Sequence, residues 1–179
     1  LGPFALTGLL IEKLAKTPSS RVVNTSSIAH NTGRIRFKDI SAERHYSASA
    51  RYSMSKLANL LFSYELQRRF EAADLPVLSV ACHPGIASTE LSRYMPRVLS
   101  KATELLQPMF NTAAAGAWPT LCAATCEAVV GGDYYGPANR FETAGPAKRV
   151  RSNRASRDTA AAGRLWDLSI EMTGVNPGI

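Results

Sequence analysis

Tyr52 and Lys56 are the side chains of this sequence whose spacing most directly suggests chemistry. They lie four residues apart in an uninterrupted helical pattern, so a helix places both on one face. A neighbouring ammonium stabilises a phenolate, the form of tyrosine that accepts a proton. The spacing alone is a weak signal, because a tyrosine packed beside a lysine stem is the commoner arrangement. The elements around the pair therefore have to decide its meaning.

Two short apolar runs flank this helix. Residues 21–25 and 77–82 predict buried strands. Residues 50–71, which contain no Gly or Pro, predict a long amphipathic helix between the two strands. A strand, a helix and a strand in this order imply a right-handed parallel crossover. The predicted fold class is therefore α/β with a parallel sheet.

The rest of the chain predicts further elements of the same fold. Residues 26–49 predict a long loop, and residues 138–157 a loose excursion over the surface. We expect 132–136 to form a short last strand. Helices are expected at 6–14, 89–94, 99–107, 112–127 and 159–173.

Both predicted strands end in residues suited to ligand binding. The first ends in Asn24-Thr25-Ser26-Ser27, whose hydroxyls can donate to a carbonyl oxygen. The second runs into residues 83–89, where Pro and Gly shape a turn into a helix start that can meet a phosphate or carboxamide group. His83 at that strand end predicts a histidine satisfied by its neighbours, with no catalytic role.

Composition limits the function classes. A length of 179 residues with 45% apolar content predicts one globular domain, and neither a signal peptide nor a membrane span is expected. An odd number of cysteines favours a reducing compartment, so we expect a cytoplasmic protein. Cys122 and Cys126 lie one helical turn apart, but no His or third Cys is near them. We therefore expect buried core thiols and no metal site.

The net charge of +7 raises the question of a polyanion partner. Its densest source, residues 148–157, has no aromatic side chain for base stacking, so we expect a solvated loop and no nucleic-acid partner. The alternative is that one of its arginines holds an anionic group of a substrate or cofactor.

Three segments in register resemble a known family. RVVNTSSIAH, YSMSKLANLLFSYEL and HPGIASTEL are similar, in order and spacing, to the three C-terminal motifs of the short-chain dehydrogenases/reductases, in the branch of the retinol dehydrogenases and protochlorophyllide reductases. The resemblance implies the C-terminal part of a Rossmann-type, doubly wound parallel sheet with helices on both faces. It also implies hydride transfer between NADP or NAD and a small-molecule alcohol or carbonyl compound, with NADP favoured by analogy. It leaves a homo-oligomer open.

The same resemblance assigns roles to individual residues. Tyr52 is the implied general acid and base, Ser27 the implied donor to the substrate oxygen, and Lys56 the implied ligand of the nicotinamide ribose. Ser26 is expected to line the pocket. The implied cofactor contacts are Asn24, Thr25, Tyr52, Lys56, Pro84, Gly85, Ile86 and Thr89.

The motifs expected for the other half of the cofactor are missing from the sequence. No Gly-x-Gly-x-x-Gly follows a strand, so we interpret residues 1–179 as a single domain that is the C-terminal portion of such an enzyme, without its N-terminal dinucleotide-binding βαβ units. The apolar segment 91–110 favours a lipophilic substrate, although a helix pair packed on the core explains it equally well. The alternatives are a non-catalytic nucleotide-binding member and a sugar-nucleotide epimerase or dehydratase of the extended family.

Overall fold

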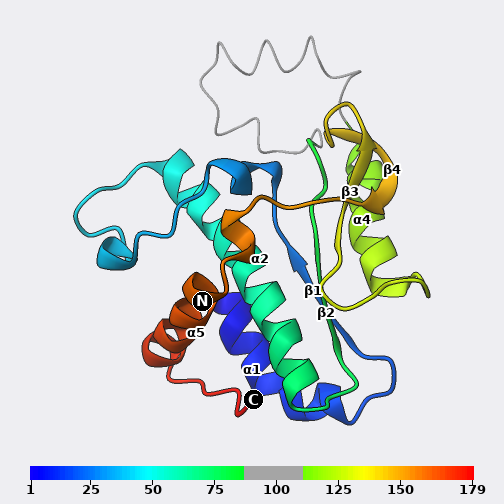
Figure 1. The fold of residues 1–179 in the computed structure, drawn as a ribbon. Helices are drawn as coiled ribbons and strands as arrows, with labels where there is room; N and C mark the ends of the chain where they lie inside the picture. The colour runs from blue at the N-terminus through cyan, green and yellow to red at the C-terminus, as the bar shows by residue number, and fades with distance from the viewer. Residues whose placement is uncertain (87–110) are drawn as a thin grey trace.

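The fold is built on a four-stranded sheet in the order β1-β2-β3-β4 (Figure 1). The structure is a computed structural model that describes residues 1–86 and 111–179. β1 pairs with β2 and β2 with β3 in parallel, whereas β3 and β4 are antiparallel. The strands are β1 (Arg21–Thr25), β2 (Leu78–Cys82), β3 (Tyr134–Asn139) and β4 (Ala144–Arg149). The helices are α1 (Gly2–Ala15), α2 (Ala48–Ala72), α4 (Ala113–Thr125) and α5 (Thr159–Thr173), with short 3₁₀ helices η1 (Ile28–Thr32), η2 (Phe37–Asp39) and η5 (Ala155–Arg157).

Helices cover both faces of this sheet. α1 and α2 pack on one face, α5 packs against α2 on the outside, and α4 covers the opposite face (Figure 1). This arrangement confirms the predicted α/β class, because a parallel pair of strands is stable only when both of its faces are covered.

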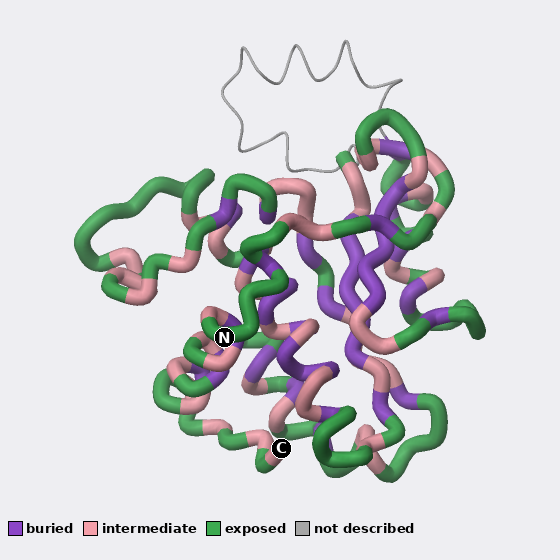
Figure 2. The backbone as a smooth tube through the Cα atoms, viewed as in Figure 1, coloured by how far each residue is buried: buried purple, intermediate pink, exposed green. Residues whose placement is uncertain are grey.

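The buried stripe of α2 explains why this helix organises the fold. Leu57, Leu60, Leu61, Leu66 and Phe70 are each at most 2% exposed and face β1, β2 and α5 (Figure 2). Burying one such side chain stabilises the fold by about 1.5–3 kcal/mol. The helix predicted at 50–71 is confirmed, and it begins two residues earlier.

The predicted elements that flank α2 are also found. α1, β1, β2, α4 and α5 lie where the sequence predicts them, with ends that differ by a few residues. Residues 26–49 are more ordered than a plain loop, because η1 and η2 lie within them. The helices predicted at 89–94 and 99–107 lie outside the described residues.

β4 corrects two predictions. The strand expected at 132–136 is β3, but it is not the last one, and the surface excursion expected at 138–157 instead contains a strand that pairs antiparallel with β3. The sequence of β4, AGPAKR, is rich in residues that strands usually avoid. Pro146 is tolerated because β4 is an edge strand, where one ladder donor is not needed. Pairing with β3, and not local propensity, makes this segment a strand.

Candidate active site

Tyr52 and Lys56 project from the same side of α2. The Lys56 Nζ lies 5.5 Å from the centre of the Tyr52 ring, and the Tyr52 side chain is 42% exposed. The approach of the ammonium to the phenol that the spacing predicts is therefore present in the fold. The phenol is open to a ligand.

The carboxyl end of β1 meets this side of α2. The Thr25 carbonyl accepts a hydrogen bond from Asn59 Nδ2 at 2.9 Å and a longer one from Lys56 Nζ at 3.4 Å. The Ser26 hydroxyl donates to the Lys56 carbonyl at 2.8 Å. These bonds fix the helix against the strand end. Sequence reasoning missed Asn59, although its position one turn after Lys56 was a usable signal.

Among the residues that the structure describes, the Ser27 hydroxyl donates its hydrogen to no protein acceptor. The half-buried Ser27 caps η1, with its Oγ accepting from the Ala29 amide at 3.2 Å. The hydroxyl hydrogen can therefore still be donated to a ligand.

Two residues that precede Ser27, Asn24 and Ser26, are buried. Ser26 is buried against α2 and does not line an open pocket, because its hydroxyl is used by the Lys56 carbonyl. Asn24 is 6% exposed, and its Nδ2 has no hydrogen-bond partner within the described part of the chain. Alternation along β1 puts both side chains on the α2 face. The predicted contact of Asn24 with a cofactor stays a prediction.

The turn after β2 is held by the β3–β4 hairpin, which we define as residues 134–149. Gly85 has φ +75°, and a Cβ there would lie 2.4 Å from the Thr143 carbonyl oxygen. The Ile86 amide donates to the same carbonyl at 2.9 Å. Pro84 and Ile86 thus lie where the sequence predicts, at the carboxyl end of β2, with Ile86 41% exposed. Thr89 lies outside the described residues.

His83 is a structural histidine, as expected. It is buried, its Nδ1 accepts from the Gly85 amide at 3.2 Å, and its Nε2 lies 3.2 Å from the Glu142 carboxylate. The ring therefore carries its hydrogen on Nε2. Burial, with a smaller effect of His30, lowers the pKa of His83 to about 4, so the ring is neutral near pH 7.

The partner of His83 comes from a strained turn that sequence reasoning missed. Arg140, Phe141 and Glu142 all have positive φ, between 51° and 64°, at the tip of the β3–β4 hairpin. Each such non-glycine residue costs about 1 kcal/mol or more. No local sequence pattern marks this turn, because Asn, Asp and Gly, the usual residues at positive φ, are absent from it.

The long segment before α2 is anchored beside Tyr52. Arg51 donates to the Asp39 carboxylate at 2.5 Å and to the His45 carbonyl at 2.7 Å. The hydrogen bond from the Arg44 backbone amide lowers the pKa of Asp39 more than the contacts with Arg51 and His45 do. The segment is thus tied to the start of α2.

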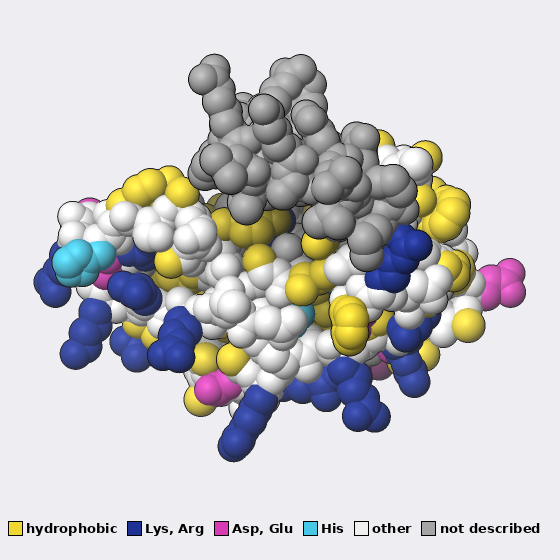
Figure 3. Space-filling view, turned by 90° about the horizontal axis from the view of Figure 1, so that it is seen from above, with side chains coloured by type: hydrophobic (Ala, Val, Ile, Leu, Met, Phe, Trp, Pro, Cys, Tyr) yellow, Lys and Arg dark blue, Asp and Glu magenta, His cyan; other side chains and the backbone are white. Residues whose placement is uncertain are grey.

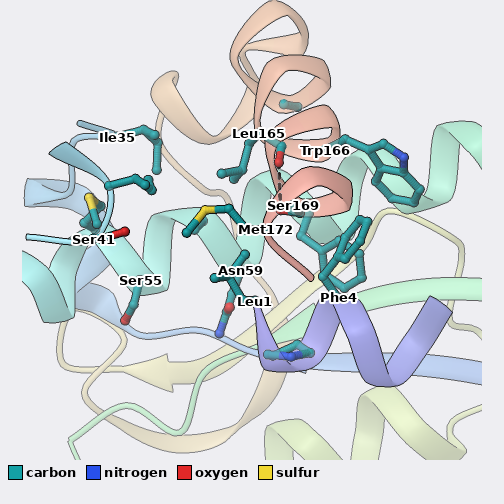
Figure 4. Close-up of a pocket in the computed structure, with 16 residues that line it drawn as sticks. Leu1, Phe4, Ile35, Ser41, Ser55, Asn59, Leu165, Trp166, Ser169 and Met172 are labelled. Carbon is teal, nitrogen blue, oxygen red and sulfur yellow. Dashed lines mark hydrogen bonds between the residues drawn. The ribbon is translucent and has the colours of Figure 1, made fainter. Parts of the chain in front are cut away.

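An apolar hollow in the described chain lies next to this site. It measures about 230 Å³ and lies between α1, α2 and α5 (Figure 4). From α2 it takes Met54, Ser55 and Asn59, and because Asn59 also donates to the Thr25 carbonyl beside Lys56, the hollow adjoins the side of the helix that carries Tyr52 and Lys56. The lining is apolar and holds none of the residues predicted for catalysis.

Basic side chains lie at the edge of the molecule in the view from above (Figure 3). Figure 3 shows Lys and Arg side chains spread around the rim of one face. Of the basic stretch 148–157, Lys148 and Arg149 belong to β4 and not to a loop, which corrects that prediction, although both are exposed as expected.

The cysteines at the end of α4 differ from expectation as well. Cys122 is half-buried and Cys126 is exposed, so the prediction of buried core thiols is wrong for Cys126. Across residues 1–86 and 111–179, no three His, Cys, Asp or Glu side chains gather in a way that could hold a metal ion.

Comparison with known proteins agrees with this geometry. Human retinol dehydrogenase 12 is 37% identical over 177 residues, which cover 98% of this chain and 52% of that protein. Mouse retinol dehydrogenase 14 is 36% identical over 185 residues, covering 98% and 51%. A crystal structure of an uncharacterized protein from Mycobacterium paratuberculosis superposes with a TM-score of 0.76 at 37% identity, covering 99% of this chain and 57% of that one.

The chain belongs to the short-chain dehydrogenase/reductase family. It spans about half the length of the curated relatives it matches. No protein-family model matches it. Within the described parts of this dehydrogenase-like chain, no helix has both the length and the apolar character needed to cross a membrane.

Proposed function

We propose that the protein to which this chain belongs transfers a hydride between a nicotinamide cofactor and a lipophilic alcohol or carbonyl compound. The observation that carries the proposal is the open side of α2, where the exposed Tyr52 and the Lys56 ammonium lie beside the carboxyl end of β1. The names of its relatives, retinol dehydrogenases, suggest an apolar alcohol as the substrate class.

The residues at this site fit the nicotinamide half of such a cofactor. Lys56 has three N–H donors, and its hydrogen-bond acceptor within the described chain is the Thr25 carbonyl at the long distance of 3.4 Å, so donors remain for ribose hydroxyls. Ile86 presents exposed apolar surface on which a ring can pack. When bound, the cofactor supplies or accepts the hydride. We favour NADP over NAD by analogy with the family branch.

The protein side chains would handle the proton. Tyr52 gives a proton from its Oη to the substrate oxygen during reduction and takes it back during oxidation. Ser27 donates its free hydroxyl hydrogen to the same oxygen and so stabilises the charge that develops there. The hydrogen bond from the Ser26 hydroxyl to the Lys56 carbonyl holds the end of β1, next to Ser27, against the turn of α2 that carries Tyr52.

The substitution Tyr52→Phe tests this function in the full-length protein. It removes the proton donor without changing the ring, so we expect turnover of retinal with NADPH or NADH to fall by about 10²–10⁴-fold. Cofactor binding, followed by fluorescence enhancement, should persist. Tyr46→Phe is the matched control, because Tyr46 is exposed and lies in the segment before α2.

Two outcomes would contradict the proposal. Undiminished turnover in Tyr52→Phe would remove Tyr52 from the mechanism. If neither NADPH nor NADH gave fluorescence enhancement or thermal stabilisation, that result would favour a non-catalytic member of the family.

A further inference from the structure

Two cysteines face each other at the end of α4. The Sγ atoms of Cys122 and Cys126 are 2.9 Å apart, and Cys126 is exposed while Cys122 is half-buried. The third cysteine, Cys82, is fully buried and bonded to Thr120 and Thr25 instead. The pair therefore differs from Cys82 in having both a thiol partner and access to solvent.

The surrounding backbone holds this pair in place. Cys126 leaves the helix with ψ 135°, while its amide still donates to the Cys122 carbonyl. The Arg21 Nη1 donates to the Ala123 carbonyl at 3.2 Å and to the Cys126 carbonyl at 2.9 Å. Arg21 begins β1, so the pair lies at the opposite end of that strand from Thr25 and the candidate active site.

We propose that Cys122 and Cys126 form a dithiol modification site that exchanges with small-molecule disulfides and closes into a disulfide within the chain. The proposal is independent of the oxidoreductase function. It uses neither Tyr52 nor Lys56.

The exchange balances without a further reactant. The Cys126 thiolate attacks one sulfur of the small disulfide, and the first small thiolate leaves. The Cys122 thiolate then attacks the Cys126 sulfur of this mixed disulfide and displaces the second small thiolate. Each released thiolate takes up a proton that a protein thiol gave away, so two protein thiols are oxidised and one small disulfide is reduced to two thiols.

Access and acidity set the order of the two steps. Cys126 is the exposed sulfur and reacts first. Burial, together with Cys126 itself, raises the pKa of Cys122 to about 11. Its thiolate is scarce near pH 7, so we expect closure to be slow there and to accelerate as the pH rises.

Closure has to deform the end of α4. Side chains one helical turn apart have Cβ atoms about 5–6 Å apart, whereas a disulfide needs about 3.5–4.5 Å. The last turn must therefore tighten. Such a movement is easier at the end of a helix than within it, because the backbone of Cys126 has already left the helical conformation, with ψ 135°.

Incubation of the full-length protein with oxidised glutathione tests the site. Trypsin places both cysteines in the peptide 102–140 and Cys82 in the peptide 70–93. We expect the first peptide to lose two hydrogens without gaining glutathione, to recover them with dithiothreitol, and the second to stay unmodified. In Cys122→Ser the same peptide should keep one glutathione on Cys126, because the second thiol is missing.

A stable glutathione adduct on Cys126 of the unmutated protein would overturn the proposal, as would two thiols that stay free. Phenylarsine oxide, which bridges two neighbouring thiols, gives a second measurement that needs no substitution. We expect one equivalent to block both Cys122 and Cys126 from a thiol reagent. Two thiols that remain titratable would also overturn the proposal.

Discussion

The α2–β1 corner, which we define as α2 with the carboxyl end of β1, and the β3–β4 hairpin serve the candidate site in different ways. The corner supplies groups that can react, such as the exposed Tyr52 and the half-buried Ser27, on a base of tightly packed apolar side chains. The hairpin supplies Glu142, which contacts His83 across 59 residues of sequence and supports the turn at Gly85. The comparison teaches that reacting groups follow local patterns, while the backbone that positions a ligand depends on distant segments.

The largest expected effect comes from the base of the corner. Phe70 is fully buried in a cluster with side chains of α1 and α5 and with Val77, so Phe70→Ala should lower the free energy of unfolding by about 3–5 kcal/mol. Phe141→Ala in the hairpin is the matched control, because Phe141 is 98% exposed and should change stability by less than about 0.5 kcal/mol. Urea unfolding measures both. Equal losses would show that the two regions are packed alike.

The pH dependence of stability should report on His83. Its pKa is about 4 in the folded protein and 6.5 as the ordinary value, so the unfolded chain binds the proton more readily between these values. The free energy of unfolding should therefore fall as the pH drops from about 6.5 to 4, by about 3 kcal/mol for this group. Urea unfolding across this range should show a shallower fall in His83→Gln. An unchanged profile in the variant would contradict the assignment.

A smaller effect is expected where His83 meets β3. A Cβ at Gly136 would lie 2.1 Å from His83 Nε2, so Gly136→Ala should displace the ring and cost about 1–3 kcal/mol. Gly163→Ala in α5 is the control, because nothing lies within 4 Å of its added Cβ, and it should stabilise the helix by about 0.5–1 kcal/mol. Thermal unfolding should show a lower melting temperature for Gly136→Ala and a higher one for Gly163→Ala. A neutral Gly136→Ala would mean that His83 is not held against β3.

The smallest effect is expected at the outer edge of the hairpin. Arg149 is 70% exposed and lies 3.4 Å from Asp133, so Arg149→Ala should cost less than about 1 kcal/mol. Asp133→Asn should cost more, because this carboxylate also accepts bonds from the Val130 amide and the Tyr135 hydroxyl. Chemical denaturation of both variants tests the order. The reverse order would make the ion pair the main contact.

Much of the corner could be predicted from the sequence. Helix and strand periodicities fix which side chains share a face, so the sequence could predict the pairing of Tyr52 with Lys56 and the polar end of β1. The burial of Asn24 and Ser26 was not readable, since it depends on which face of β1 meets α2. Asn59 was within reach of the same reasoning, one turn beyond Lys56.

The hairpin could not be predicted in the same way. Its second strand has poor strand propensity, and its tip holds three non-glycine residues at positive φ. Both features persist only because pairing with β3 and the contacts of Glu142 and Thr143 outweigh the local cost. Local sequence carries no trace of these contacts.

The sequence by itself determined the α/β class, the approximate positions of the central elements and the residues offered for chemistry, because these follow from hydrophobic periodicity and from the order of motifs. The tertiary structure alone decided that β4 pairs with β3, that Glu142 supports His83, and that the Cys122 and Cys126 sulfurs meet at an open helix end. These features arise from contacts between segments far apart in the chain, or from solvent access, and both exist only once the elements have packed.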